Sequence, residues 1–425
     1  MFSLLFIKFL EQHFVATAIL LLLPIPLRAL ETYLRRWRLA HAQGCQDATS
    51  KNLKQILATG CEDFDLPEFR TSVIGHIFGQ GIFVLSGHTW KHARTVLRRS
   101  FKKDNPAPFL ETLERSFQAF TKHIPTDGSE VDIQPLFLAL TMDVSTKFLM
   151  GHSTNMLSDK TDHTREQQFV DDYMICSEEI IQQMQLGPLH CLKFNFAAKR
   201  AKKRVYAYLD TFIEESLQSP KDNSGGNFLT DIMAIANDKK CLSDHILHIL
   251  LASRDTTSSL LSNLFFFLSK NAYIYTKLRE EVLSISGQTP PTANQLKEMT
   301  YLKWDTTIPR GGGADGQSPL FISKGTAMFY NVYAMHRNEG VFGPRTEEFV
   351  PERWQDLRPG WGYLPFNGGA RACIGQQYAL LETHYVVARL VQTYTQLESR
   401  DDKEWMELYA LALCSRNGTR VAAGI

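Results

Sequence analysis

The sequence predicts a mainly α-helical fold with a minor β part. Stretches with apolar residues at helical spacing recur along the chain, whereas extended segments are few, the clearest being Pro319–Ile322. Hydrophobic residues make up 44% of the 425 residues and charged residues 21%, which excludes wholesale disorder and fibrous structure. A formal net charge of +1 gives no electrostatic reason to expect nucleic acid as a partner. The predicted helical stretches are Lys91–Lys103, Leu110–His123, Val205–Leu217, Leu242–Leu268 and Tyr378–Tyr394.

The N-terminal segment predicts a membrane anchor. Phe14–Leu27 is apolar but shorter than the ~20 residues of a spanning helix, and Met1–Leu10 supplies the missing length, with Glu11 in between. The arginines that follow favour a cytosolic location for the rest of the chain: Arg28, Arg35, Arg36 and Arg38. We therefore divide the chain into an anchor, residues 1–30, and one domain, residues 31–425. A buried first helix of a soluble protein is the alternative interpretation.

One of the seven cysteines has a distinctive setting. The segment from Phe366 to Gly375 reads F-x-x-G-x-R-x-C-x-G, a glycine-rich loop that presents Cys373 just before a predicted helix. Free amide groups at a helix N-terminus favour a thiolate, and Arg371 adds positive charge. A permanent thiolate suits an iron ligand. The plainer alternative is a structural cysteine in a glycine loop.

This segment resembles the haem-binding loop of the cytochrome P450 monooxygenases. The resemblance implies the fold of that family, haem b as cofactor, and Cys373 as the metal ligand. It also implies that Arg371 contacts a haem propionate. The remaining matched positions, Phe366, Gly369 and Gly375, would then belong to the haem-binding loop.

Two further segments resemble motifs of this family. Trp90 and Arg94 form a W-x-x-x-R pair on one predicted helix face, and the resemblance implies that both point at haem propionates. Ala252–Thr257 resembles the distal-helix motif A-G-x-D/E-T, which implies that Asp255 and Thr256 relay protons to iron-bound dioxygen. Ser253 replaces the usual glycine. The plainer alternatives are an ordinary amphipathic helix for the first segment and a solvated helix face for the second.

The sequence departs from the family pattern at two places. No E-x-x-R motif occurs, although the family's helix with this motif belongs between Tyr301–Trp304 and Arg310, and no proline lies between Pro26 and Pro67. We therefore expect the chain to lack the E-x-x-R helix and part of the first sheet, either through missing sequence segments or as a natural shortened paralogue. Phe349–Trp354 matches F-x-P-E-R-[FW], whose arginine, here Arg353, would lose its glutamate partner. We therefore expect weak haem binding or none.

The resemblance implies an O₂- and NADPH-dependent monooxygenase. Within the family, the sequence looks most like the fungal microsomal alkane and fatty-acid hydroxylases. This likeness implies an endoplasmic reticulum membrane location with a cytosolic catalytic domain. The implied partners are NADPH–cytochrome P450 reductase, supplying electrons from NADPH, and an apolar substrate: a fatty acid, an alkane or a fungal secondary metabolite. The basic stretch Lys91–Lys103 is either a reductase-docking surface or a solvated face. The alternative function is that of a truncated, haem-free family member without catalysis, or a membrane-associated scaffold.

Overall fold

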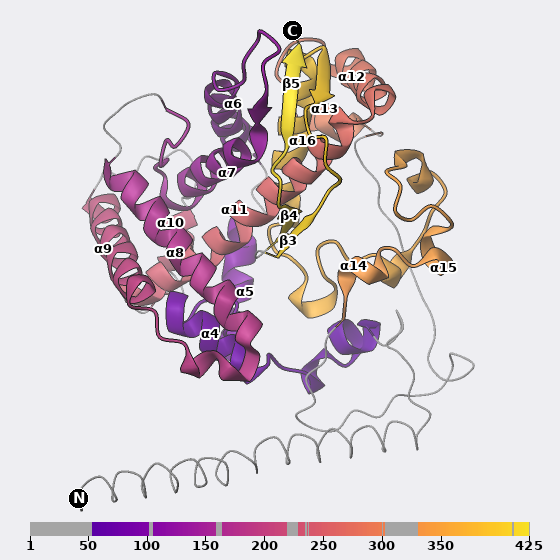
Figure 1. Cartoon of the computed structure of the whole chain (residues 1–425). Helices are drawn as coiled ribbons and strands as arrows, with labels where there is room; N and C mark the ends of the chain where they lie inside the picture. The colour runs from indigo at the N-terminus through magenta and orange to yellow at the C-terminus, as the bar shows by residue number, and fades with distance from the viewer. Residues whose placement is uncertain are drawn as a thin grey trace, which may run out of the picture. The chain divides into compact units, whose positions relative to one another are not determined.

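The computed structural model describes residues 53–101, 105–158, 164–218, 228–233, 236, 238–299, 301, 330–409 and 412–424 (Figure 1). The chain divides into two compact units, which we describe separately. The larger unit comprises Phe64–Asp305, Glu347–Asp356 and Ala372–Ile425, and the smaller one Met1–Asp63, Thr306–Thr346 and Leu357–Arg371. The predicted anchor and the predicted extended segment Pro319–Ile322 lie outside the described residues. Within the described ranges, no helix is both long and apolar enough to cross a bilayer.

The larger unit is mainly helical, as the sequence predicted. Each of the five predicted helical stretches falls largely within a helix: α5 (Gly87–Ser100), α6 (Ala107–Thr121), α9 (Phe196–Gln218), α11 (Lys239–Ser269) and α16 (Gln376–Thr393). The other α-helices among the described residues of this unit are α4 (Glu68–Phe78), α7 (Ile133–Met150), α8 (Thr164–Leu186), α10 (Phe228–Met233), α12 (Ala272–Ser286) and α13 (Ala293–Glu298).

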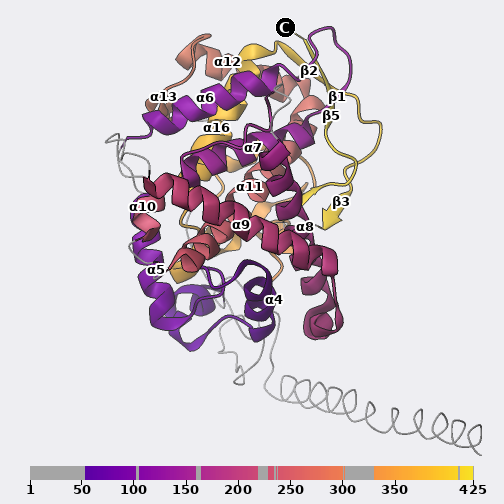
Figure 2. The same cartoon turned by 90° about the vertical axis from the view of Figure 1, so that its left-hand side faces the viewer.

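Helix α11 runs through the interior of this unit. Its N-terminus is capped by Asp238, whose carboxylate accepts the Cys241 amide N–H at 2.7 Å. Most of the helix is buried, and its most extensive packing partner is α7 (Figure 2). Phe137 of α7 packs against Phe265 of α11 with ring centroids 5.7 Å apart. Burial on several sides explains why the apolar residues of α11 are not confined to one stripe.

Two small antiparallel sheets form the β part. In the first, β5 (Arg420–Gly424) lies between β1 (Val131–Asp132) and β2 (Gln396–Ser399). The register pairs Val131 with Val421 on one side of β5 and Leu397 with Ala423 on the other. The second sheet pairs β3 (Glu407–Tyr409) with β4 (Leu413–Ser415). Val421, Ala422 and Ala423 of β5 are all buried, and Val421 and Ala423 belong to the hydrophobic core.

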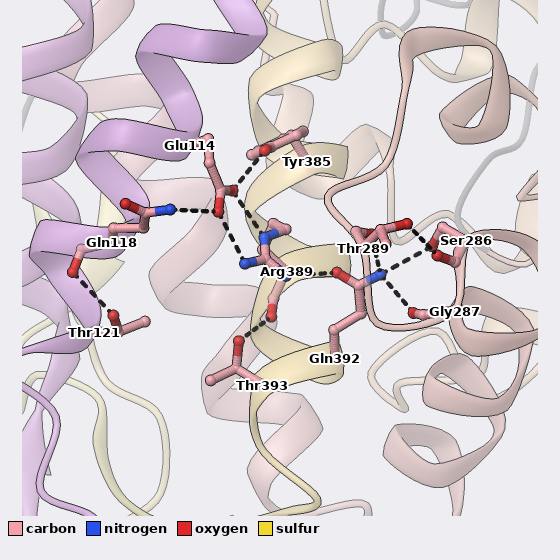
Figure 3. Close-up of polar contacts among 10 residues, drawn as sticks. All are labelled: Glu114, Gln118, Thr121, Ser286, Gly287, Thr289, Tyr385, Arg389, Gln392 and Thr393. Atoms are coloured by element: carbon pink, nitrogen blue, oxygen red, sulfur yellow. Dashed lines mark hydrogen bonds and ion pairs between the residues drawn. The ribbon is translucent and has the colours of Figure 1, made fainter.

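Helix α16 is fixed by polar contacts along one side (Figure 3). The Glu114 carboxylate of α6 accepts Arg389 Nε at 2.8 Å and Nη2 at 2.9 Å, and the Tyr385 hydroxyl at 2.6 Å. One turn further on, the Gln392 amide donates to Ser286 Oγ at 2.9 Å and to the Gly287 carbonyl at 2.8 Å, at the end of α12. Since α16 follows the cysteine loop directly, these contacts fix the helix that carries the loop.

We expect Glu114→Ala to lower the free energy of unfolding by about 3 kcal/mol, because it leaves the largely buried Arg389 guanidinium uncompensated. Burial would raise the pKa of Glu114, but the Arg389 and Tyr385 hydrogen bonds and the Arg389 charge hold it below its usual 4.5. The stabilisation is therefore present above about pH 4.5 and is lost as the pH falls below that value. Urea unfolding at several pH values measures both effects.

The control is Glu130→Ala, which removes the partner of Arg420 from an ion pair whose side chains are about half exposed. Exposed pairs contribute under about 1 kcal/mol, so this variant should unfold nearly as the wild type does. Equal losses in the two variants would contradict the special role of the Glu114–Arg389 pair.

The described part of the smaller unit consists of short helices and turns. It contains α14 (Val332–Met335) and α15 (Glu339–Phe342), followed by single turns at Gly360–Gly362 and Gly369–Arg371. His336 Nε2 accepts the Leu364 amide N–H at 2.9 Å. Burial, with a smaller contribution from Arg337, lowers the pKa of His336 to about 4, so the ring is neutral at pH 7 and keeps this acceptor.

Candidate functional site

Cys373 lies three residues before α16, whose N-terminal cap is Gly375. Its side chain is exposed, yet the surrounding protein raises the pKa of the thiol above its usual 9.0. The Gly375 amide N–H and the charge of Arg94 act in the opposite direction but do not outweigh desolvation. Desolvation by the surrounding protein therefore opposes the predicted preference for thiolate, which rested on the helix N-terminus and nearby positive charge. Deprotonation would come with metal binding.

Helix α5 contacts the cysteine loop through Arg94. The Arg94 Nη2 atom donates to the Ala372 carbonyl at 2.5 Å, one residue before Cys373. The Arg94 guanidinium also lies over the Trp90 ring, 5.6 Å from its centroid, as the four-residue spacing predicts. Trp90 is buried, so the pair is fixed against the protein interior. The two segments that the sequence singled out separately, W-x-x-x-R and the cysteine loop, meet here.

The acid–hydroxyl pair lies at the centre of α11. The Asp255 carboxylate accepts Arg254 Nη1 at 2.7 Å, and burial raises its pKa above the usual 3.8 although Arg254 opposes the rise. The Thr256 hydroxyl is exposed and donates to the Ala252 carbonyl at 2.6 Å. A carboxyl with a raised pKa carries a proton more readily near neutral pH, which suits a proton donor.

The rest of the predicted loop belongs to the smaller unit. Phe366 and Arg371 are half-buried there, and Gly369 has φ +63°. A Cβ at Gly369 would lie 1.8 Å from the Leu57 carbonyl oxygen, so no side chain fits at this position. This is the physical reason for the second glycine of the loop.

The structure around Arg353 differs from the expectation that its charge lacks a partner. Arg353 is half-buried and has an interaction partner. Its neighbour Glu352 accepts Lys277 Nζ at 2.7 Å and the Tyr301 hydroxyl at 2.8 Å. The penalty for a fully buried, uncompensated guanidinium therefore does not apply. The stretch in which the E-x-x-R helix was expected lies outside the described residues.

Glu382 of α16 is a buried acid that the motifs did not predict. Its side chain is 5% exposed, its Oε1 has no hydrogen-bond partner within the described ranges, and burial raises its pKa to about 8. Between the usual value of 4.5 and about 8, the folded chain keeps this proton whereas the unfolded chain releases it. Stability should therefore fall as the pH rises through this window.

We expect Glu382→Gln to remove that pH dependence, because the amide has the same shape and does not titrate. The variant should gain at least about 1 kcal/mol over the wild type on going from pH 5 to pH 8. Glu111→Gln, at an exposed position of α6, is the control and should leave the pH profile unchanged. Parallel profiles for the wild type and Glu382→Gln in urea unfolding would refute the assignment.

The residues of the larger unit fit an iron porphyrin. The exposed Cys373 thiol is a soft ligand for iron. The Arg94 guanidinium has five N–H donors, so it can donate hydrogen bonds to the Ala372 carbonyl and to a carboxylate at the same time. On α11, which is otherwise largely buried, Thr256 and Leu260 are exposed one turn apart, and Leu260 is 45% exposed. An exposed leucine beside a threonine hydroxyl suits the face of a flat apolar group.

Two features of the site were not predicted from the sequence. The Arg254 partner of Asp255 could have been suspected, because oppositely charged neighbours stand side by side in the chain. The Ala372 carbonyl could not, because a backbone acceptor has no sequence signal.

Comparison with known proteins identifies the family. The sequence model of the family described as Cytochrome P450 matches residues 36–305 and 315–419. Cytochrome P450 monooxygenase himC of Aspergillus japonicus is 37% identical over 417 residues, which cover 90% of this chain and 74% of himC. Cytochrome P450 52A13 of Debaryomyces hansenii is 34% identical over 416 residues, covering 88% and 80% of the two chains. A crystal structure of a cytochrome P450 shares the fold, with a TM-score of 0.69, 21% identity and coverage of 85% and 84%. The helical fold, the meeting of Arg94 with the cysteine loop and these relatives agree: the chain belongs to the cytochrome P450 family of monooxygenases.

Proposed function

We propose that this chain inserts one oxygen atom of O₂ into an apolar substrate, using haem b held by Cys373 and electrons from NADPH through NADPH–cytochrome P450 reductase. The observation that carries the proposal is the Arg94–Ala372 hydrogen bond, because it joins the W-x-x-x-R helix to the residue preceding the iron ligand. The proposed haem-binding residues are Trp90, Arg94, Phe366, Gly369, Arg371 and Gly375.

Bound haem iron would supply the activation of O₂, and the chain would supply the ligand and the protons. Cys373 would bind the iron and would give up its proton in doing so. The Thr256 hydroxyl donates to the Ala252 carbonyl, so its oxygen lone pairs remain able to accept a proton from elsewhere and pass its own proton on. Asp255, with its raised pKa, is the proposed proton source, and Arg254 fixes the orientation of its carboxyl group.

The proposed electron donor docks on the exposed face of α5. Lys91, Arg98 and Arg99 are exposed there, while Trp90 and Leu97 on the other face are buried. A basic face suits an acidic flavoprotein, because complementary charge accelerates encounter. Lys102 and Lys103, which extend the basic stretch in sequence, lie outside the described residues.

The proposed location is the endoplasmic reticulum membrane. The support is the apolar sequence of residues 1–30, followed by arginines, together with the family resemblance. Residues 31–425 would then form a cytosolic haem-thiolate domain. A membrane location also suits the proposed substrates, which are fatty acids, alkanes or apolar fungal secondary metabolites, since these concentrate in lipid.

The second candidate is a haem-free family member without catalysis. Its specific support is that the family match breaks between residues 305 and 315, where the E-x-x-R helix was expected, and that the sequence contains no E-x-x-R.

Expression of the full chain with a haem precursor separates the two candidates. Haem content and the reduced, CO-bound spectrum are measured first, and a thiolate-haem band at about one haem per chain supports the enzyme. Reconstitution with the reductase, NADPH and a series of n-alkanes and fatty acids then tests for hydroxylated products. A chain that folds, as judged by circular dichroism, but retains no haem would establish the haem-free alternative.

A further inference from the structure

We propose that Asp244 and His248 of α11 are positioning residues that hold the Gly79–Phe83 loop, and through it the start of α5, in place for haem binding. This inference rests on the proposed haem-binding function. The Gly79–Phe83 loop joins α4 to the segment that enters α5, and only six residues separate Phe83 from Trp90. Neither Asp244 nor His248 belongs to a motif that the sequence singled out.

Asp244 binds the beginning of the loop. Its carboxylate is 1% exposed and accepts the Gln80 amide N–H at 2.6 Å and the Tyr206 hydroxyl of α9 at 2.7 Å. Lys240, one turn earlier on α11, donates to the same carboxylate at 2.9 Å. A buried carboxylate with one backbone and two side-chain donors is compensated, and it fixes the backbone at Gln80.

His248 binds the end of the loop. Its Nδ1 accepts the Phe83 amide N–H at 3.1 Å, so the ring proton is on Nε2, which faces the Gly79 carbonyl at 3.3 Å. The ring stacks on Phe83 with centroids 5.6 Å apart. Burial lowers the pKa of His248 to about 3, so this neutral arrangement persists at all physiological pH values.

The loop backbone approaches both side chains as closely as atoms allow. A Cβ at Gly79 would lie 2.1 Å from Asp244 Oδ1, and a Cβ at Gly81 would lie 2.4 Å from His248 Cγ. The two glycines are therefore matched to the two side chains of α11, and the loop has little freedom to shift along the helix.

These contacts connect the two halves of the proposed haem site. His248 precedes Thr256 by eight residues on α11, about 12 Å at the helical rise of 1.5 Å per residue. From the loop the chain enters α5, where Trp90 and Arg94 lie, and Arg94 bonds the residue before Cys373. One continuous set of contacts thus runs from the helix with the proton-transfer pair to the iron ligand. Loosening the loop should displace α5 and weaken haem retention.

The test uses Asp244→Asn and His248→Phe in the full chain. Asparagine removes the charge with little change of shape, and phenylalanine keeps the ring stack but removes the acceptor for the Phe83 amide. Hydrogen exchange of a peptide covering residues 79–83 should accelerate about tenfold in each variant. The rate of haem transfer to excess apomyoglobin should rise by a similar factor, whereas global circular dichroism should stay near that of the wild type.

Asp172→Asn is the matched control. Asp172 of α8 is also buried, but within the described ranges its carboxylate accepts from Gln168 of α8 and from Arg204 Nε of α9, at 2.7 Å, and not from the loop. This variant should lose stability yet keep the wild-type haem transfer rate and loop exchange. Unchanged loop exchange in both test variants would overturn the proposal, and so would faster exchange with haem transfer no faster than in Asp172→Asn. If the wild-type chain binds no haem, the proposed function and the positioning role toward haem both fail. Hydrogen exchange of residues 79–83 in the variants would then still show whether α11 holds the loop.

Discussion

Cys373→Ser should abolish the thiolate-type spectrum of the reduced, CO-bound protein. A serine hydroxyl is a hard ligand that stays protonated near neutral pH, so it cannot replace a thiolate on iron. The remaining contacts of the loop should survive, because the Arg94 bond uses the backbone of Ala372 rather than the cysteine side chain. We therefore expect a folded chain with less haem and no hydroxylated product.

Cys414→Ser supplies the control for this experiment. Cys414 is a half-buried free cysteine on β4, in the same unit as Cys373. Its replacement should leave the thiolate-haem band and the haem content unchanged. If the band survived in Cys373→Ser and disappeared in Cys414→Ser, the ligand assignment would be wrong.

Thr256→Ala and Asp255→Asn should leave haem binding intact and lower product formation by roughly 10²-fold, the typical contribution of a positioned proton donor. The alanine variant lacks the hydroxyl that donates to the Ala252 carbonyl, and the asparagine variant lacks the acid that Arg254 orients. Both should continue to oxidise NADPH to some extent, so the ratio of product to NADPH consumed should fall and peroxide should accumulate. That ratio separates a failure of proton delivery from a simple loss of folded enzyme.

The adjacent Thr257 offers a matched comparison, since its side chain is buried on the other side of the same turn. Thr257→Ala should cost some stability but keep the product-to-NADPH ratio of the wild type. A similar fall in all three variants would indicate a general disturbance of α11 and would argue against specific roles for Asp255 and Thr256.

The sequence predicted those helices whose apolar residues are spaced regularly or run continuously. It identified α6 and α16 from stripes and α11 from its length. Helices α7 and α8 were not predicted. Buried polar residues interrupt their patterns, for example Asp143 in α7, which accepts the Met156 amide and the Thr154 hydroxyl, and Asp172 in α8, which binds Arg204. The C-terminal strands were missed as well, because β3 and β4 are three residues long and carry almost no periodicity.

For the site, the local motifs were informative and the long-range contacts were not. The four-residue spacing of Trp90 and Arg94 correctly predicted their stacking, since helical geometry alone determines it. The desolvation that raises the pKa of the Cys373 thiol could not be predicted from the sequence, because it depends on how much protein surrounds the thiol, a tertiary property. The roles of Asp244 and His248 were not predicted, because both side chains bind a loop about 165 residues earlier in the chain.

The Arg94–Ala372 hydrogen bond also bears on how this protein is made. Its two residues are 278 positions apart, and β1 near the N-terminal side pairs with β5 at the C-terminal end. At synthesis rates of about 5–20 residues per second, the cysteine loop is synthesised on the order of 14–60 seconds after α5, the helix that it contacts. During that interval Arg94 lacks the Ala372 carbonyl, and closing so large a loop slows folding. Haem should therefore be incorporated only after the cysteine loop has been synthesised, and nascent chains truncated before α16 should depend on chaperones to remain soluble.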